Sequence, residues 1–240
     1  MKSFILTLTA AAAVAGTASA GDVTGKITLK GTPAPEKEIP MDPACGALHA
    51  GKKPTTRFYV ADASGGLADC VVYLEGAKGA PGTAPVVIDQ KGCEYLPYIN
   101  TASVNQTIRV LNSDPVMHNI HPTPTVDGNK ESNKAQLPKG APLDHSFAKA
   151  EKFLRFKCDV HPWMFAYVNV VEHRFFAVSG ADGRFVLPEP PPGDYTVRLY
   201  HRKAGDKLIP VKVQLGQRLV LNITLDITDT ARSEATTSGQ

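Results

Sequence analysis

The sequence predicts an almost entirely β protein. Glycine and proline supply 20 and 19 of the 240 residues, and helical periodicity is hard to find. The apolar stretches are short, alternate with polar residues and end at turn-forming residues, as in half-buried strands. We therefore expect strands over residues 23–30, 69–75, 94–100, 106–112, 116–121, 152–158, 164–171, 175–179, 184–187, 194–201, 208–214 and 218–227.

The chain begins with a segment typical of a secretory signal peptide. Residues 1–20, MKSFILTLTAAAAVAGTASA, contain a lysine, an apolar run and a final Ala-Ser-Ala pattern, which predicts cleavage before Gly21. We expect a mature protein that is soluble in the periplasm or outside the cell, because no later stretch is long and apolar enough to span a bilayer. Loss of Lys2 lowers the formal charge of +3 by one, and such a near-neutral chain has no electrostatic footprint for nucleic acid.

Two kinds of sequence alternate in the remainder. Residues 31–65, with five prolines, are expected to form a long exposed connection, and residues 229–240 a disordered tail. The stretch FFAVSGADGRFVLPEPPPGDYTVRLYH contains an Asp-Gly turn between two strands, then a proline-rich corner and another strand. It resembles the carboxypeptidase regulatory-like module, a small transthyretin-like β-sandwich, whose first strands are similar to VTGKITLKG and LADCVVYLEG. The resemblance covers residues 21–88 and 172–228, and implies that residues 89–171 are an inserted second β domain.

A group of metal-binding side chain types lies in the segment FKCDVHPWM, residues 156–164. Because side chains alternate along a strand, Cys158 shares the apolar face of Phe156 and points inward. Met164 begins the next strand, and a five-residue connection compatible with a hairpin brings both sulfurs to one end of the same core. His161 lies in this connection.

A second imidazole is expected from the segment PVMHNIHP. His118 and His121 are three residues apart, so they point to opposite faces of a strand. His118 shares the apolar face of Ile120, so we assign it as a ligand. His121 is expected either at the surface or in a hydrogen bond to one of the ligand residues. Two imidazoles, a thiolate and a weak thioether make a type 1 copper site, while a thioether suits zinc poorly. A nucleophilic Cys-His pair would need an orienting group and an oxyanion hole, which the sequence does not mark.

The pattern VMHNIH, followed some forty residues later by C-x-x-H-x-x-M, resembles the cupredoxin family with the short ligand loop of amicyanins. The resemblance covers nearly all of residues 93–171 and implies a cupredoxin-like Greek-key β-sandwich or barrel with one type 1 copper per chain. A segment of about eighty residues is short for a cupredoxin. The domain boundary therefore stays open, with the alternative that the other domain contributes one strand. The implied copper ligands are His118, Cys158, His161 and Met164.

The same resemblance gives roles to residues around the ligands. Asn119 and Asp159 are expected to hydrogen-bond around the copper-bound sulfur and to tie the ligand loops together; the alternative for Asn119 is a surface turn amide. Pro162, Trp163 and Phe165 would form an apolar docking patch around an exposed edge of the loop imidazole, suited to brief contacts with redox partners. The alternative for Trp163 is packing against the other domain.

Resemblance to bacterial cupredoxin-like proteins with an early C-G and a later G-C-x-Y-x-P favours a Cys45–Cys93 disulfide. Cys70 alternates with apolar residues and is expected to be a buried free thiol, although a Cys70–Cys93 bridge stays open because sequence cannot settle connectivity. Four histidines without ligand spacing are expected to be ordinary polar residues, namely His49, His145, His173 and His201.

The leading hypothesis is a periplasmic type 1 copper protein that transfers single electrons between redox partners, such as a cytochrome or a periplasmic oxidoreductase. We expect no enzymatic activity, because four protein ligands leave no open position for a substrate. The alternatives are a copper carrier or sensor with the same ligands, and an envelope structural or interaction module with a cupredoxin fold. The other sandwich would serve as a scaffold or docking surface.

Overall fold

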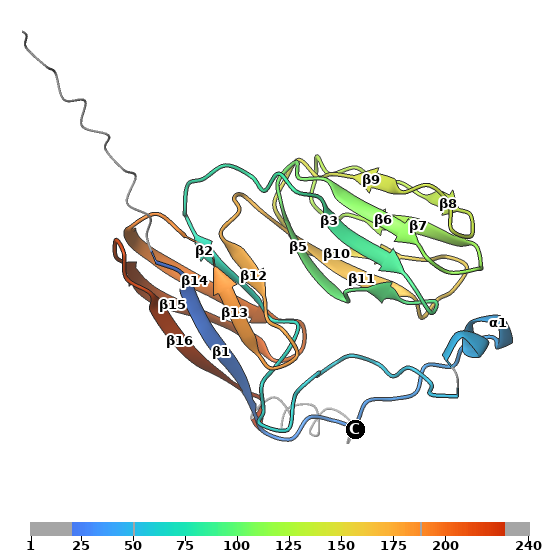
Figure 1. Ribbon diagram of the computed structural model, residues 1–240, viewed down its shortest axis with the longest axis horizontal. Coiled ribbons are helices and arrows are strands. Elements are labelled where there is room, and N and C mark those ends of the chain that lie inside the picture. The colour runs from blue at the N-terminus through green and yellow to red at the C-terminus, as the bar shows by residue number, and fades with distance from the viewer. Residues whose placement is uncertain (1–20, 50, 188, 229–240) are drawn as a thin grey trace, which may run out of the picture.

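The computed structural model describes residues 21–49, 51–187 and 189–228, and within this part the regular structure is nearly all β (Figure 1), which confirms the predicted fold class. The signal peptide expected at residues 1–20 and the disordered tail expected at 229–240 lie outside the described residues. The strands form four open sheets that enclose two main hydrophobic cores. Among the described residues, no helix has the length and hydropathy needed to cross a membrane.

The first sandwich is built from strands near the beginning and near the end of the described chain. One sheet has the order β13-β1-β16 and the other the order β12-β2-β14-β15. Strand β1 is antiparallel to β13 and parallel to β16. The bounds are β1 (Val23–Lys30), β2 (Val71–Glu75), β12 (Phe176–Val178), β13 (Arg184–Leu187), β14 (Gly193–His201), β15 (Gly205–Val213) and β16 (Leu219–Asp226). Alternate side chains of both sheets point inward and form one apolar core.

The expected Asp-Gly turn links β12 in one sheet to β13 in the other. Gly183 has a φ of 78°, and a Cβ built there would lie 2.2 Å from the carbonyl oxygen of Ile27. Only glycine fits this position without a clash. The backbone N–H of Ile27 donates to the Gly183 carbonyl at 2.9 Å, so the turn also fixes where β1 lies between its neighbours.

The second sandwich consists of sheets with the orders β5-β11-β10-β7-β8 and β4-β3-β6-β9. The expected domain start at residue 89 falls inside β3, which pairs in parallel with β6. The single strand expected over 94–100 is two strands in different sheets, with Pro97, which lacks a backbone donor, between them. The bounds are β3 (Val86–Gln90), β4 (Tyr95–Leu96), β5 (Ile99–Ser103), β6 (Ile108–Asn112), β7 (His118–Thr123), β8 (Lys134–Gln136), β9 (Leu143–His145), β10 (Glu151–Lys157) and β11 (Phe165–Val171).

Alternation along β10 sets the direction of the Cys158 side chain. The pairing of β10 with β11 shifts between Glu151 and Leu154, and Phe153 has a φ of 54° within this bulge. From Leu154 onward the alternation is regular, and Leu154, Phe156 and Cys158 are all buried in the second core. The bulge turns Phe153 out of this core into a third apolar cluster.

The third cluster lies between the two sandwiches. It is built from aromatic and branched side chains of both, with Tyr167 and Tyr200 among its buried members. The Tyr200 hydroxyl donates to Asn169 Oδ1 at 3.0 Å, and the same oxygen accepts the backbone N–H of Phe153 at 2.9 Å. Asn169 is fully buried, and the bond from Tyr200 reaches it from the other sandwich, so this bond adds a directional contact to the apolar interface.

Residues 31–65, which we call the arm, leave the end of β1, reach a short helix beside the second sandwich and return (Figure 1). The two halves of the arm pair through a bridge between Glu38 and Thr55. The helix α1 (Pro43–Gly46) is followed by the 3-10 turn η1 (Ala47–His49). A Cys45–Cys93 disulfide joins the arm to the second sandwich. Cys70 is a buried free thiol in the first sandwich, and its burial raises its pKa to about 12.

His201 couples the stability of the first sandwich to pH. Its ring is 5% exposed, and Nδ1 accepts the backbone N–H groups of Lys203 and Ala204. Burial, with a smaller contribution from Arg202, lowers the pKa of His201 from 6.5 to about 4. The unfolded chain therefore takes up a proton at His201 below pH 6.5, whereas the folded chain does so only near pH 4. The free energy of unfolding falls as the pH is lowered across this window.

We expect the free energy of unfolding to drop by about 2–3 kcal/mol through His201 alone between pH 6.5 and 4. A His201→Gln variant keeps an acceptor but cannot titrate, so its loss of stability over this window should be smaller by that amount. Urea unfolding of both proteins at several pH values measures the difference. Parallel pH profiles for wild type and variant would contradict the assignment.

Candidate metal centre

Three side chains with ligand atoms meet at one end of the second sandwich. His118 begins β7, Cys158 follows the last residue of β10, and His161 lies in the loop before β11. The two Nδ1 atoms are 3.0 Å apart, and Cys158 Sγ is 3.6 Å from His161 Nδ1. All three residues are buried, with exposed fractions of 0%, 2% and 7%.

Two backbone hydrogen bonds shape the loop between β10 and β11. The N–H of Cys158 donates to the Met164 carbonyl at 3.0 Å, and the N–H of Met164 donates to the His161 carbonyl at 2.9 Å. These bonds close the loop tightly enough to return His161 toward Cys158. Met164 is 1% exposed and belongs to the same core cluster as Cys158. The loop therefore brings the expected fourth ligand residue into the same end of the core.

The hydrogen bond between His118 and Asp114 determines which ring nitrogen of His118 faces the cluster. His118 Nε2 lies 2.9 Å from Asp114 Oδ2, and since a carboxylate only accepts, Nε2 carries the proton and Nδ1 is left for a metal. Burial alone would lower the pKa of His118, but Asp114 and Cys158 raise it overall. The Asp114 carboxylate also accepts the N–H groups of Gly92 and Cys93 at 2.7 and 2.8 Å.

Asn119 connects β7 to the loop that carries the thiol. Its Oδ1 accepts the backbone N–H of Asp159 at 2.7 Å and lies 3.1 Å from Cys158 Sγ. Burial would raise the pKa of the Cys158 thiol, but hydrogen bonds from the His118 side chain and from the backbone, including Asn119, lower it overall. This environment favours the thiolate, which is the form that binds metals.

Asp159 and His121 belong to a polar network on the outer face, which Asn119 joins by donating from Nδ2 to Asn133 Oδ1 at 2.6 Å. His121 Nδ1 lies 2.7 Å from Asp159 Oδ2, and its Nε2 lies 2.6 Å from Glu131 Oε1. Asp159 also pairs with Lys157 at 2.8 Å and accepts from Asn133 at 2.7 Å. Lys157 and His121 are the two largest causes of the lowered pKa of Asp159. His121 thus points away from the cluster and braces the residue that follows Cys158.

The arm covers the outer edge of His161. Asp42, the N-cap of α1, places Oδ2 3.6 Å from His161 Nε2. The sulfur atoms of Cys45 and Cys93 lie within 4.8 Å of a ring nitrogen of His161. The sequence predicts an exposed imidazole edge, whereas His161 is only 7% exposed. The reason is the disulfide, which fixes α1 over the loop.

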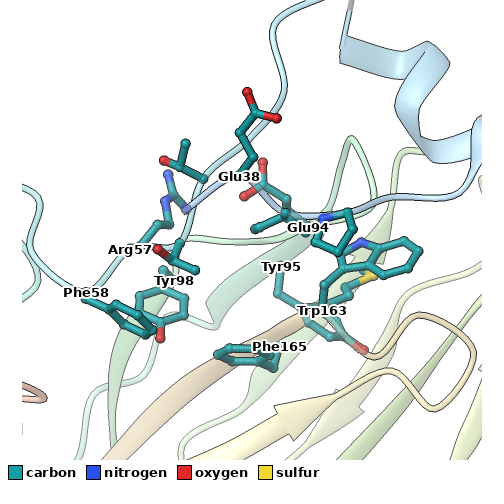
Figure 2. A pocket seen from close by; sticks show the side chains of 13 residues that line it. Glu38, Arg57, Phe58, Glu94, Tyr95, Tyr98, Trp163 and Phe165 are labelled. Carbon is teal, nitrogen blue, oxygen red and sulfur yellow. The ribbon is translucent and has the colours of Figure 1, made fainter. Parts of the chain in front are cut away.

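The three residues of the expected docking patch differ in their surroundings. Pro162 is exposed, while Trp163 and Phe165 are half-buried. The Trp163 ring lies against that of His161, with centroids 5.3 Å apart, and both Trp163 and Phe165 line a pocket shared with the arm (Figure 2). On this side Trp163 therefore lies against the arm, which is part of the predicted segment 21–88, as in the alternative of packing on the other domain.

Among the described residues, three groups of potential ligands are close enough to hold an ion, and two of them include Cys93. A sulfur in a disulfide is not available as a thiolate ligand. Of these groups, only His118, Cys158 and His161 thus have all their ligand atoms free. None of His49, His145, His173 and His201 belongs to such a group within the described part of the chain.

Asp114 and Asp42 were not identified from the sequence. Asp114 lies four residues before His118, in the turn between two strands. Acidic residues are common in such turns, so the position alone does not indicate a metal site. Asp42 lies 119 positions before His161, in the arm, and its place depends on the disulfide. The predicted disulfide and the predicted ligand loop do not place Asp42 by themselves, because the sequence does not show that the disulfide lies beside His161.

No family model and no curated protein matches the chain. Solved structures similar to part of it are copper proteins, at low TM-scores. A mutant of amicyanin in the Cu(I) state is 19% identical, with a TM-score of 0.32 over 41% of this chain and 97% of that one. A copper-containing nitrite reductase from Thermus scotoductus SA-01 is 20% identical, with a TM-score of 0.34 over 56% of this chain and 27% of that one. A purple cupredoxin from Nitrosopumilus maritimus is 25% identical, with a TM-score of 0.30 over 35% of this chain and 98% of that one. With similarity this partial, the identity of the metal depends on the ligand chemistry of the centre itself.

Proposed function

We propose that this protein is a type 1 copper protein that transfers single electrons between redox partners. The observation that carries the proposal is the convergence of two imidazole Nδ1 atoms and one thiol in a buried cluster. A buried set of two imidazoles and one thiolate, with a methionine beside it, matches the ligand preference of copper in electron-transfer sites. When bound there, copper would accept and release one electron at a time.

The residues around the cluster suit this role because they fix the ligands before a metal arrives. Asp114 holds the His118 ring through Nε2, and Asn119 holds the backbone beside Cys158. Ligands that cannot move present the same geometry to both oxidation states, so little reorganisation accompanies a change of charge. Met164, buried in the same core end, would supply the weak axial ligand.

The proposal includes no enzymatic activity, since four ligand residues from the chain leave no position for a substrate. It places the mature protein in the periplasm, with a cytochrome or an oxidoreductase as partner. The first sandwich, with its resemblance to the carboxypeptidase regulatory-like module, would be the scaffold that carries the arm. A partner that approaches His161 would meet Pro162 and the α1 end of the arm first, because these cover or flank the ring.

Addition of Cu(II) to the purified, metal-free protein should produce an intense visible band from charge transfer between thiolate and copper. A Cys158→Ser variant should lack the band, because the hydroxyl cannot replace the thiolate. A Cys70→Ser variant is the matched control, since it removes the other buried free thiol, and it should keep the band. Absorption spectroscopy measures all three; no band in the wild type, or the same spectrum from Cys158→Ser, would refute the proposal.

The axial role of Met164 can be tested separately. A Met164→Gln variant should keep the visible band, because the thiolate remains, but should have a lower reduction potential, because an amide oxygen favours Cu(II) more than a thioether does. Met117→Gln makes the same change at an exposed methionine and should leave the potential unaltered. Voltammetry gives both potentials, and equal values for the two variants would exclude Met164 as a ligand.

The support of His118 by Asp114 predicts a loss of copper affinity on substitution. In an Asp114→Asn variant the amide cannot accept all three N–H groups that the carboxylate accepts, so the His118 ring is less firmly held. We expect Cu(I) affinity to fall about 10- to 100-fold, as for other residues that orient a ligand. Competition with a Cu(I) chelator measures it. The control Asp144→Asn removes a surface carboxylate paired with Arg109; equal affinities of the two variants would show that Asp114 does not support the ligand.

A further inference from the structure

The Cys45–Cys93 disulfide lies against the metal centre. Its two sulfur atoms and one ring nitrogen of His161 are all within 4.8 Å of one another. Cys45 and Cys93 are 0% exposed, and His161 is 7% exposed. This group includes no fourth histidine, cysteine or acidic side chain among the residues that the structure describes. Reduction of the bridge would therefore leave two thiols beside one imidazole in a buried position.

Two thiolates and one imidazole favour Cu(I) as the bound ion. Thiolates are soft ligands, which select Cu(I) and zinc and bind magnesium or calcium poorly. Structural zinc sites are almost always closed by four protein ligands, whereas this group has three. Cu(I) is stable with three ligands, and none of the three carries an oxygen ligand atom. The chemistry of the group therefore fits Cu(I) better than zinc.

The tip of the arm gives a reductant a way to the buried disulfide. Cys45 itself is fully buried, but its neighbours at positions 43, 44 and 46–48 are exposed. The helix α1 that carries it has only four residues. Besides the disulfide, the tip is held by His49, whose Nε2 donates to the Gly92 carbonyl at 2.7 Å, and by the contact of Asp42 with His161. An element this small and exposed can open locally without unfolding of the sandwiches.

The electrons for reduction would come from a dithiol, such as the active site of a thioredoxin-like protein. One of its thiolates attacks a sulfur of the bridge, and its second thiol then releases the mixed disulfide. The bridge gains two electrons and two protons and becomes two thiols, while the dithiol becomes a disulfide. Uptake of Cu(I) releases both thiol protons to solvent, because the thiolate is the form that binds a metal.

We propose that Cys45, Cys93 and His161 form a second metal site, which takes up Cu(I) once a dithiol has reduced the disulfide. Cys93 Sγ also lies within 4.8 Å of a ring nitrogen of His118, so this site borders both imidazoles of the first centre. The two sites have His161 in common and compete for it. The proposal does not depend on electron transfer at the first centre, because its test removes Cys158.

The test uses a Cys158→Ser variant, which lacks the thiolate of the first centre. One sample is reduced with a phosphine and desalted without oxygen, and a second sample stays oxidised; Cys70 is a free thiol in both. Competition with a Cu(I) chelator should show one Cu(I) per reduced chain. We expect binding at least about 100-fold tighter than in the oxidised sample, since two thiolates are gained. Equal affinities of the two samples would overturn the proposal.

Further changes in the Cys158→Ser background identify the ligands. Replacing both Cys45→Ser and Cys93→Ser frees the arm without supplying thiols, and this variant should bind Cu(I) no more tightly than the oxidised sample. His161→Gln should weaken binding by the reduced chain at least about tenfold, whereas His201→Gln, in the first sandwich, should not. The affinity of the reduced sample in the serine pair, or equal effects of the two histidine changes, would refute the assignment.

Tryptophan fluorescence shows whether the ligand loop stays in place after reduction. Trp163 is the one tryptophan of the chain, and its ring lies against that of His161. Its emission should stay close to that of the oxidised protein. A shift to the emission of the denatured chain would contradict the proposal, because the three ligands would no longer be held together. The visible band of the oxidised, Cu(II)-loaded wild type is a separate measurement, so failure here leaves the proposed function intact.

Discussion

The Asp114 carboxylate accepts hydrogen bonds from three parts of the chain, namely the His118 ring and the backbone N–H groups of Gly92 and Cys93. Burial opposes its ionisation, yet these bonds lower its pKa overall, and hydrogen bonds to a charged acceptor are about twice as strong as neutral ones. The same carboxylate thus fixes the ligand that begins β7 and the turn that carries the disulfide. Asp114 thus links the His118, Cys158 and His161 cluster to the turn on which the arm is anchored.

The disulfide extends that constraint to the arm. It links positions 48 residues apart, and closing a loop of this length stabilises a folded chain by roughly 4 kcal/mol in the chain-entropy model. A proline-rich segment with little apolar surface could not hold its place by burial alone. The result is that α1 stays over His161, and that the pocket beside Trp163 keeps its second wall. At the interface of the two sandwiches, the hydrogen bond from Tyr200 to the buried Asn169 side chain adds a directional contact to the apolar packing.

Much of the β architecture follows from local sequence, and the exceptions have physical causes. The period of two along a strand is exact enough that the inward direction of Cys158 and the separation of His118 from His121 could be read directly. Strands β8 and β9 have three residues each, too few for alternation to show. Within residues 94–100 the apolar side chains continue on both sides of Pro97; the proline marks the break, but the pattern does not show the change of sheet. The course of the arm has no periodic signal at all, because it is set by a disulfide and a cap rather than by burial.

In the proposed electron-transfer role, covering His161 would have two opposing consequences. Exclusion of water by α1 lowers the local dielectric and strengthens the hydrogen bonds that hold the ligands, which limits reorganisation. It also lengthens the path from the ring to a protein partner, because the arm and the disulfide lie outside it. Trp163 partly offsets this, since its ring contacts His161 on one side and borders the pocket on the other. On this side the side chain next to His161 is therefore Trp163, whose other side borders an aromatic pocket and not a broad flat patch.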